Sequence, residues 1–226
     1  MPTSSYMIYS RLYQHFKAIE PTDFRRIATF FEQNRKHIFK LDGEEYVEIM
    51  WAYSKSLFEM ADYQQCIRLS DELISYVMEH NILTINGIHI FETLLFQKGV
   101  AFMNERQFDK AVYVLEELIK ITPDDAHVEL MLQKAMHGAK PDLIRRCRAA
   151  AIVLWLTTAF LVLVERLLIQ NFYKPYQKMF IYGYEMTFGM AILVWSGGYL
   201  FQHWRVHRAV SQRIKAAKRK KILNYE

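Results

Sequence analysis

Residues 91–125 of the chain, FETLLFQKGVAFMNERQFDKAVYVLEELIKITPDD, contain the pattern that decides the fold. Apolar residues recur three and four positions apart on both sides of the polar NERQ, which predicts two amphipathic helices in succession. Gly99 and Ala111 are small residues, one in each predicted helix, so the two backbones can approach closely. The large residues that fill the space around them are Phe102, Phe108 and Leu115. The segment therefore predicts a closely packed pair of helices.

The helical periodicity extends over the first 140 residues, with cap and breaker residues between successive stretches. Alternation of the β type is almost absent, so the sequence predicts an all-α fold. The predicted helices cover about 4–19, 22–40, 44–60, 63–80, 87–105, 108–121 and 124–138.

Residues 91–125 resemble one tetratricopeptide (TPR) repeat, in which two helices form each unit. The matching positions are Leu95, Gly99 and Phe102, then Phe108, Ala111, Leu115 and Leu118, and finally Pro123 at the exit. Residues 44–77 repeat the pattern loosely and lack the small glycine. The resemblance implies a TPR-like helical solenoid of about seven helices, which binds a peptide or helix in its concave groove.

The resemblance also implies which residues line that groove, mainly on the first helix of each pair. They are Glu48, Trp51, Lys55, Phe96, Val100, Asn104, His127 and Lys134. A receptor for chaperone tails is not expected, because Trp51, Phe96 and Val100 occupy the places of the polar clamp residues of such domains. For Trp51, Phe58 and Phe96 the alternative is a plain core position, which is the common fate of aromatic residues at helical spacing.

Two apolar segments follow, and each approaches the roughly twenty residues that a helix needs to cross a bilayer. They cover about 149–169 and 179–201. Lys and Arg residues flank the pair on its outer sides, so both termini are expected in the cytoplasm. The chain is thus predicted to be an integral membrane protein. The general character of the sequence, rather than any motif, favours a bacterial inner membrane. Its parts are a cytosolic domain (1–140), a transmembrane hairpin (141–204) and a basic cytosolic tail (205–226).

Three ionisable residues fall inside the predicted spans, namely Glu165, Arg166 and Glu185. Such residues often mark ion or proton pathways. The alternative is a structural clasp, in which Arg166 pairs with Glu185 and Glu165 reaches the interface.

The tail concentrates positive charge, which suits an anionic lipid surface. The residues expected at that surface are Arg213, Lys215, Lys218, Arg219, Lys220 and Lys221. A signal that only fixes the topology is the alternative. Nucleic acid is not expected as a partner, because the charges follow a membrane span immediately.

No motif of an enzyme occurs, so neither catalysis nor a cofactor is expected. His203 and His207 have a spacing that metal sites use, but a polar helix exit explains them more simply, and no metal is expected. The predicted function is a membrane-anchored adaptor that recruits a protein partner through its repeats. The alternative is a membrane effector or channel subunit whose hairpins oligomerise into a pore. Association into a homo-oligomer stays open.

Overall fold

The computed structural model describes residues 11–41, 43–139, 142–169 and 177–223. These form two compact units. The first comprises Met1–Ala135 together with Arg213–Glu226, and the second comprises Met136–Gln212. Both units are built from helices, which confirms the all-α class.

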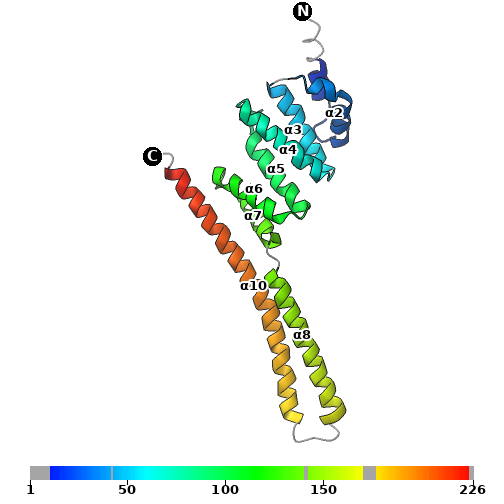
Figure 1. Ribbon diagram of the computed structural model, residues 1–226, viewed down its shortest axis with the longest axis vertical. Coiled ribbons are helices and arrows are strands. Elements are labelled where there is room, and N and C mark those ends of the chain that lie inside the picture. The colour runs from blue at the N-terminus through cyan, green and yellow to red at the C-terminus, as the bar shows by residue number, and fades with distance from the viewer. Residues whose placement is uncertain (1–10, 42, 140–141, 170–176, 224–226) are drawn as a thin grey trace, which may run out of the picture. The chain divides into compact units, whose positions relative to one another are not determined.

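The first unit is a series of consecutive helices, each packed against the next (Figure 1). Residues 11–17 are helical. After them come α2 (Phe24–Ile38), α3 (Gly43–Glu59), α4 (Tyr63–Glu79), α5 (Ile90–Asn104), α6 (Phe108–Ile121) and α7 (Ala126–Ala139). Their order and approximate bounds agree with the helices predicted over residues 22–138. The repeat-like arrangement of packed neighbours is thus present.

Local signals explain where these helices begin. Asp23 accepts a hydrogen bond from the backbone N–H of Arg26 at 3.1 Å, and Asp62 accepts one from Gln65 at 3.2 Å. Both are N-caps, which satisfy a donor at the start of a helix that has no partner inside it. The caps fix the starts of α2 and α4.

Among the described residues of this unit, a small hairpin departs from the predicted helices. Strands β1 (Thr84–Ile85) and β2 (Ile88–His89) pair in antiparallel register, and α5 begins at Ile90 rather than near residue 87. Asn86 and Gly87 both have positive φ, 50° and 78°. Two such residues in a row make the tight turn that matches the twist of paired strands. The Asn-Gly pair is therefore a hairpin turn as well as a break between helices.

The closest contact of the decisive segment is at Gly99. A Cβ atom added to this glycine would lie 2.8 Å from Leu115 Cδ2, so a side chain here would force Leu115 to shift. Ala111 is fully buried. The close packing of α5 against α6 that the small residues predict is confirmed.

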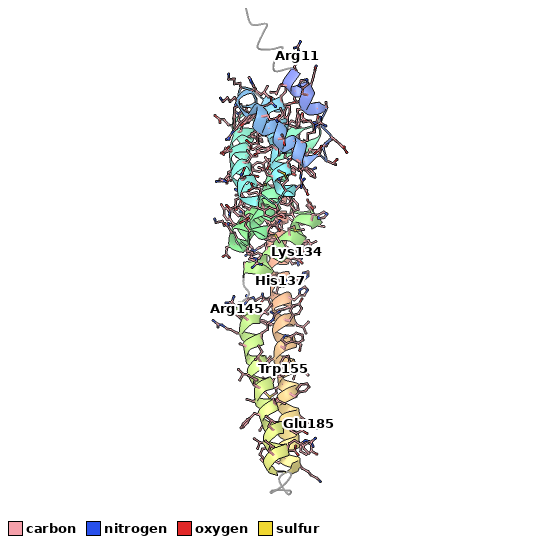
Figure 2. All side chains as sticks on the ribbon, turned by 90° about the vertical axis from the view of Figure 1, so that its right-hand side faces the viewer. Arg11, Lys134, His137, Arg145, Trp155 and Glu185 are labelled. Carbon is pink, nitrogen blue, oxygen red and sulfur yellow. The ribbon has the colours of Figure 1, made fainter. Side chains whose placement is uncertain are left out.

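The second unit contains α8 (Asp142–Val164), a π-helical turn η1 (Glu165–Ile169) and most of α10 (Gln177–Leu223). In both views α8 and α10 lie side by side (Figures 1 and 2). Thr158 Oγ1 and Thr187 Oγ1 are hydrogen-bonded across the pair at 2.9 Å. The two helices therefore form a packed hairpin.

One helix in the described part of the chain, Ile144–Leu167, is long and apolar enough to cross a membrane. Only 11% of its most apolar window is buried, whereas the core helix of a soluble protein would be mostly buried. This supports the first predicted span. The second, 179–201, is helical but does not reach the same apolarity, because Glu185 and several tyrosines and glycines interrupt it. The expectation of two spans is corrected to one candidate span among the described residues.

Candidate functional site

Five of the eight predicted groove residues line one of two separate hollows of the first unit. The N-terminal hollow, of about 240 Å³, lies between the first helix and α3 and includes Phe16, Lys17, Glu48, Trp51 and Lys55. The C-terminal hollow, of about 350 Å³, lies among α5, α6 and α7 and includes Glu92, Phe96, Asp125 and His127. Val100, Asn104 and Lys134 line neither hollow.

Glu48 is the centre of a polar cluster at the rim of the N-terminal hollow. Its carboxylate accepts hydrogen bonds from Tyr13 and Lys17 of the first helix, and from Asn86 of the hairpin turn at 3.0 Å. Burial by itself would raise the pKa of Glu48, but these donors outweigh burial and hold the pKa below its usual value. Glu48 therefore joins three elements at this rim and is held by them.

The N-terminal hollow is lined by residues of the hydrophobic core and by an exposed lysine. Trp51 and Phe58 are half-buried and pack against the hydrophobic core, as the alternative interpretation expected. Trp51 also lines the N-terminal hollow, and its buried indole N–H has no hydrogen-bond partner in the described structure. Lys55 is exposed, with its ammonium 5.9 Å from the ring centroid of Phe24. The hollow thus has an apolar floor and a basic edge.

Phe96 is half-buried at the floor of the C-terminal hollow, while His127 is exposed at its rim. The backbone N–H of His127 donates to Asp125 Oδ1 at 2.8 Å, which fixes the start of α7. Glu92 and Asp125 make this rim acidic, in contrast to the basic edge at Lys55. The two hollows would therefore favour different partner groups.

A buried polar network joins α3, α4 and α5 and was not expected from the sequence. Gln97 Nε2 donates to the carbonyl oxygen of Ser54 at 2.8 Å and approaches Cys66 Sγ at 3.3 Å. Ser70 donates to the carbonyl oxygen of Cys66 at 2.7 Å. Burial raises the pKa of the Cys66 thiol, so it stays protonated and unreactive. The network is structural, since its groups satisfy one another in the core.

The basic tail, residues 213–223, contacts the repeats. Arg213 forms an ion pair with Glu116, and Lys218 Nζ lies 2.7 Å from Asp124 Oδ1. The bond from Lys218 holds the pKa of Asp124 below its usual value. Ala217 is buried between these contacts, and Lys221 Nζ donates to the carbonyl oxygen of Ile121 at 3.5 Å. Half of the predicted lipid-surface residues therefore face α6 and the start of the α6–α7 connection.

The remaining predicted lipid-surface residues are Lys215, Arg219 and Lys220. All three are exposed and form no ion pair with a described residue. Lys215 and Arg219 are four positions apart and so share one face of the helix. The tail thus has a docked face and a free basic face.

The three ionisable residues of the predicted spans are not arranged as the alternative of a clasp describes. Glu165 is buried at the start of η1, and Arg166 Nε lies 3.8 Å from its Oε2. Glu185 is exposed and makes no ion pair with a described residue. The described ion pair of Arg166 is therefore with its sequence neighbour rather than with Glu185.

Among the described residues, no group of three or more His, Cys, Asp or Glu is arranged to hold a metal. His203 instead stacks on His137 of α7, with ring centroids 5.6 Å apart. Burial, with a smaller contribution from His203, lowers the pKa of His137.

Comparison with known proteins adds no family to this picture. No protein-family model matches the chain, and neither a curated protein nor a solved structure is significantly similar to it.

Proposed function

We propose that the protein is a membrane-anchored adaptor of the TPR type, which holds its repeats at the cytoplasmic face of a bacterial inner membrane and recruits a protein partner. α8 and the 179–201 segment of α10 cross the bilayer as a hairpin. The repeats supply the binding surface and carry no reaction of their own.

The observation that carries the proposal is the contact of the tail with the repeats. Arg213 and Lys218 follow the hairpin in sequence, whereas Glu116 and Asp124 precede it. If α8 crosses the bilayer, the chain leaves the side of the repeats and must cross again before the tail can return. The segment 179–201 would be roughly 35 Å long at 1.5 Å per residue. That length matches the hydrocarbon core, so α10 is long enough for the return crossing.

Packing within the hairpin supports a pair of spans. Thr158 and Thr187 satisfy each other across the pair, which is favourable where no water can replace the bond. Gly198 lies against Cys147, where a Cβ atom would be 2.6 Å from Sγ, so the backbones approach closely. Small residues at such contacts are typical of helix pairs in membranes. The apolar side chains of α8 that face outward would then face lipid.

The N-terminal hollow is the favoured recruitment site. Its apolar floor at Trp51 would take an apolar side chain of the partner, and Lys55 at its edge would favour a neighbouring carboxylate. Glu48 is already held by Tyr13 and Lys17, so it serves to fix the rim.

Topology tests the anchor. Reporters active only in the cytoplasm, fused before Met1 or after Glu226, should both be active, and one inserted near Tyr173 should be inactive. Termini on opposite sides would mean a single span. The tail could then not contact the repeats as described, and the second crossing would be excluded.

Photo-crosslinking in native membranes tests recruitment. A photoreactive residue in place of Lys55 should give one discrete crosslinked product, and Trp51→Ala should remove it. The matched control is the same residue at Tyr113, which is 67% exposed on α6 and lies outside both hollows. Equal products from both positions would argue against the hollow as the site.

A further inference from the structure

The surface of the hairpin has an open cavity of about 390 Å³ that the recruitment function does not use. One wall is a turn of α8 from Ile144 to Arg148, and the other is the part of α10 from Trp195 to Leu200. The cavity lies beside the close contact of Cys147 with Gly198, which keeps the two helices from closing further there. Its volume falls in the range of about 300–1,000 Å³ typical of small-molecule sites.

The chemistry of the lining is amphipathic. Trp195, Tyr199 and Leu200 supply exposed apolar surface, and each is more than half exposed. Arg148 is the cation of the lining, and it forms no ion pair with a described residue. An apolar wall with one unneutralised guanidinium at its edge calls for a ligand that has an apolar chain and an anionic group.

The position along the helix indicates the source of such a ligand. The candidate span begins at Ile144, so Arg148 lies about one turn inside it, where an arginine can extend to the headgroup layer. Trp and Tyr residues are enriched at that same depth. Basic pockets between transmembrane helices on the cytoplasmic side are known to bind anionic headgroups.

We propose that this cavity binds one anionic phospholipid of the bilayer, with its phosphate at Arg148 and an acyl chain along Trp195 and Leu200. The inference rests on the proposed membrane anchor. The guanidinium can donate two parallel hydrogen bonds to a phosphate, which fixes the headgroup more firmly than a diffuse positive surface does. The ligand thus binds at a defined place on the hairpin.

Native mass spectrometry of the full chain, extracted in mild detergent from vesicles of equal phosphatidylglycerol and phosphatidylcholine, tests this. The wild-type chain should retain one phosphatidylglycerol in preference to phosphatidylcholine. Arg148→Gln should reduce that retention by about fivefold, the factor expected for one cation near an anionic surface. Arg148→Lys keeps the positive charge but cannot donate two parallel hydrogen bonds. Its retention of phosphatidylglycerol should lie between those of the wild type and Arg148→Gln. Ser196→Trp, which fills the cavity, should remove the retained lipid.

Arg145→Gln is the matched control. Arg145 lies one turn earlier on α8, is exposed, does not line the cavity and projects away from α10 in Figure 2. Retention should be unchanged in this variant. An equal loss in Arg145→Gln and Arg148→Gln would overturn the site and indicate a diffuse basic flank.

The anchor is checked separately on the same preparations by an alkaline carbonate wash. A chain that stays in the membrane pellet but retains no phosphatidylglycerol contradicts only the lipid site. A chain that the wash releases contradicts the proposed anchor itself.

Discussion

Gly99 and Ala111 show how two small side chains set the distance between helices. Both could be identified in the sequence because small residues at these positions are enough to predict close packing. The structure confirms the close contact of Gly99 with Leu115. The buried network of Gln97, Ser54 and Cys66 could not be identified in the same way. Polar residues inside helices carry no mark of which neighbour will satisfy them, since that depends on the packing of three helices.

Overpacking at Ala111 tests the repeat alignment. Ala111→Phe should destabilise the protein by about 1–3 kcal/mol, because the site is fully buried and cannot take the ring without strain. Urea unfolding of the full chain in detergent, followed by circular dichroism, measures the change. The neighbouring exposed residue provides the control, and Lys110→Phe should leave the midpoint nearly unchanged. An equal effect of both substitutions would mean that the contact of α5 with α6 is misassigned.

The carboxylate of Glu48 should give the repeats an acid-sensitive contact. Its pKa is lowered in the folded state, so its contribution to stability is present above the unfolded pKa of about 4.3 and is lost as pH falls through the folded pKa. Stability of the wild-type chain should therefore decline below about pH 4.3, and Glu48→Gln should flatten that part of the profile. Parallel denaturant titrations at several pH values measure it. A variant whose profile has the wild-type slope would exclude Glu48 as the titrating group.

At the scale of elements, the helix order was predictable because each stretch shows helical periodicity and is bounded by cap or breaker residues. The two strands that flank Asn86 and Gly87 were not predicted, since two residues per strand are too few to show alternation. The docked face of the tail was missed for a different reason. Its partners, Glu116 and Asp124, lie almost a hundred positions earlier, and a run of basic residues does not specify which acids it meets.

The tail contact should respond to charge reversal on α6. Glu116→Lys replaces attraction to Arg213 by repulsion, so the tail should detach and trypsin should cleave after Arg213 and Lys218 several-fold faster. Stability should change little, because exposed ion pairs contribute little to folding. Time courses of limited proteolysis on the full chain in detergent measure the rate. Glu117→Lys is the matched control, since Glu117 pairs locally with Lys120 at 2.5 Å. Cleavage that is insensitive to Glu116→Lys, or equally accelerated by the control, would argue against docking.

At the scale of the whole molecule, the division into a helical-repeat unit and a helical hairpin was predictable from the change in composition near residue 148. The lower apolarity of residues 179–201 was not recognised, because interruptions by tyrosine and glycine lower apolarity without breaking the helix. Apolarity alone therefore identifies α8. The proposal that α10 also crosses the bilayer depends on the tail contact, which is visible only in the folded chain.

A chain that ends after Ala139 should still fold, because the core of the repeats lies among α2 to α7. It should be soluble without detergent and unfold cooperatively, since neighbouring repeats bury their faces together. Thermal unfolding by circular dichroism measures this. A fragment that aggregates at once, or that melts without a transition, would show that the hairpin or the tail is needed for the fold.

The return of residues 213–223 to the repeats means that the first unit is interrupted in sequence by the hairpin. On the ribosome, residue 135 and residue 213 emerge roughly 4–16 s apart at about 5–20 residues per second. During that interval the edge formed by Glu116 and Asp124 is uncovered, because the segment that covers it is made only after the hairpin. Until residues 213–223 have emerged, this edge is open to proteases and other proteins.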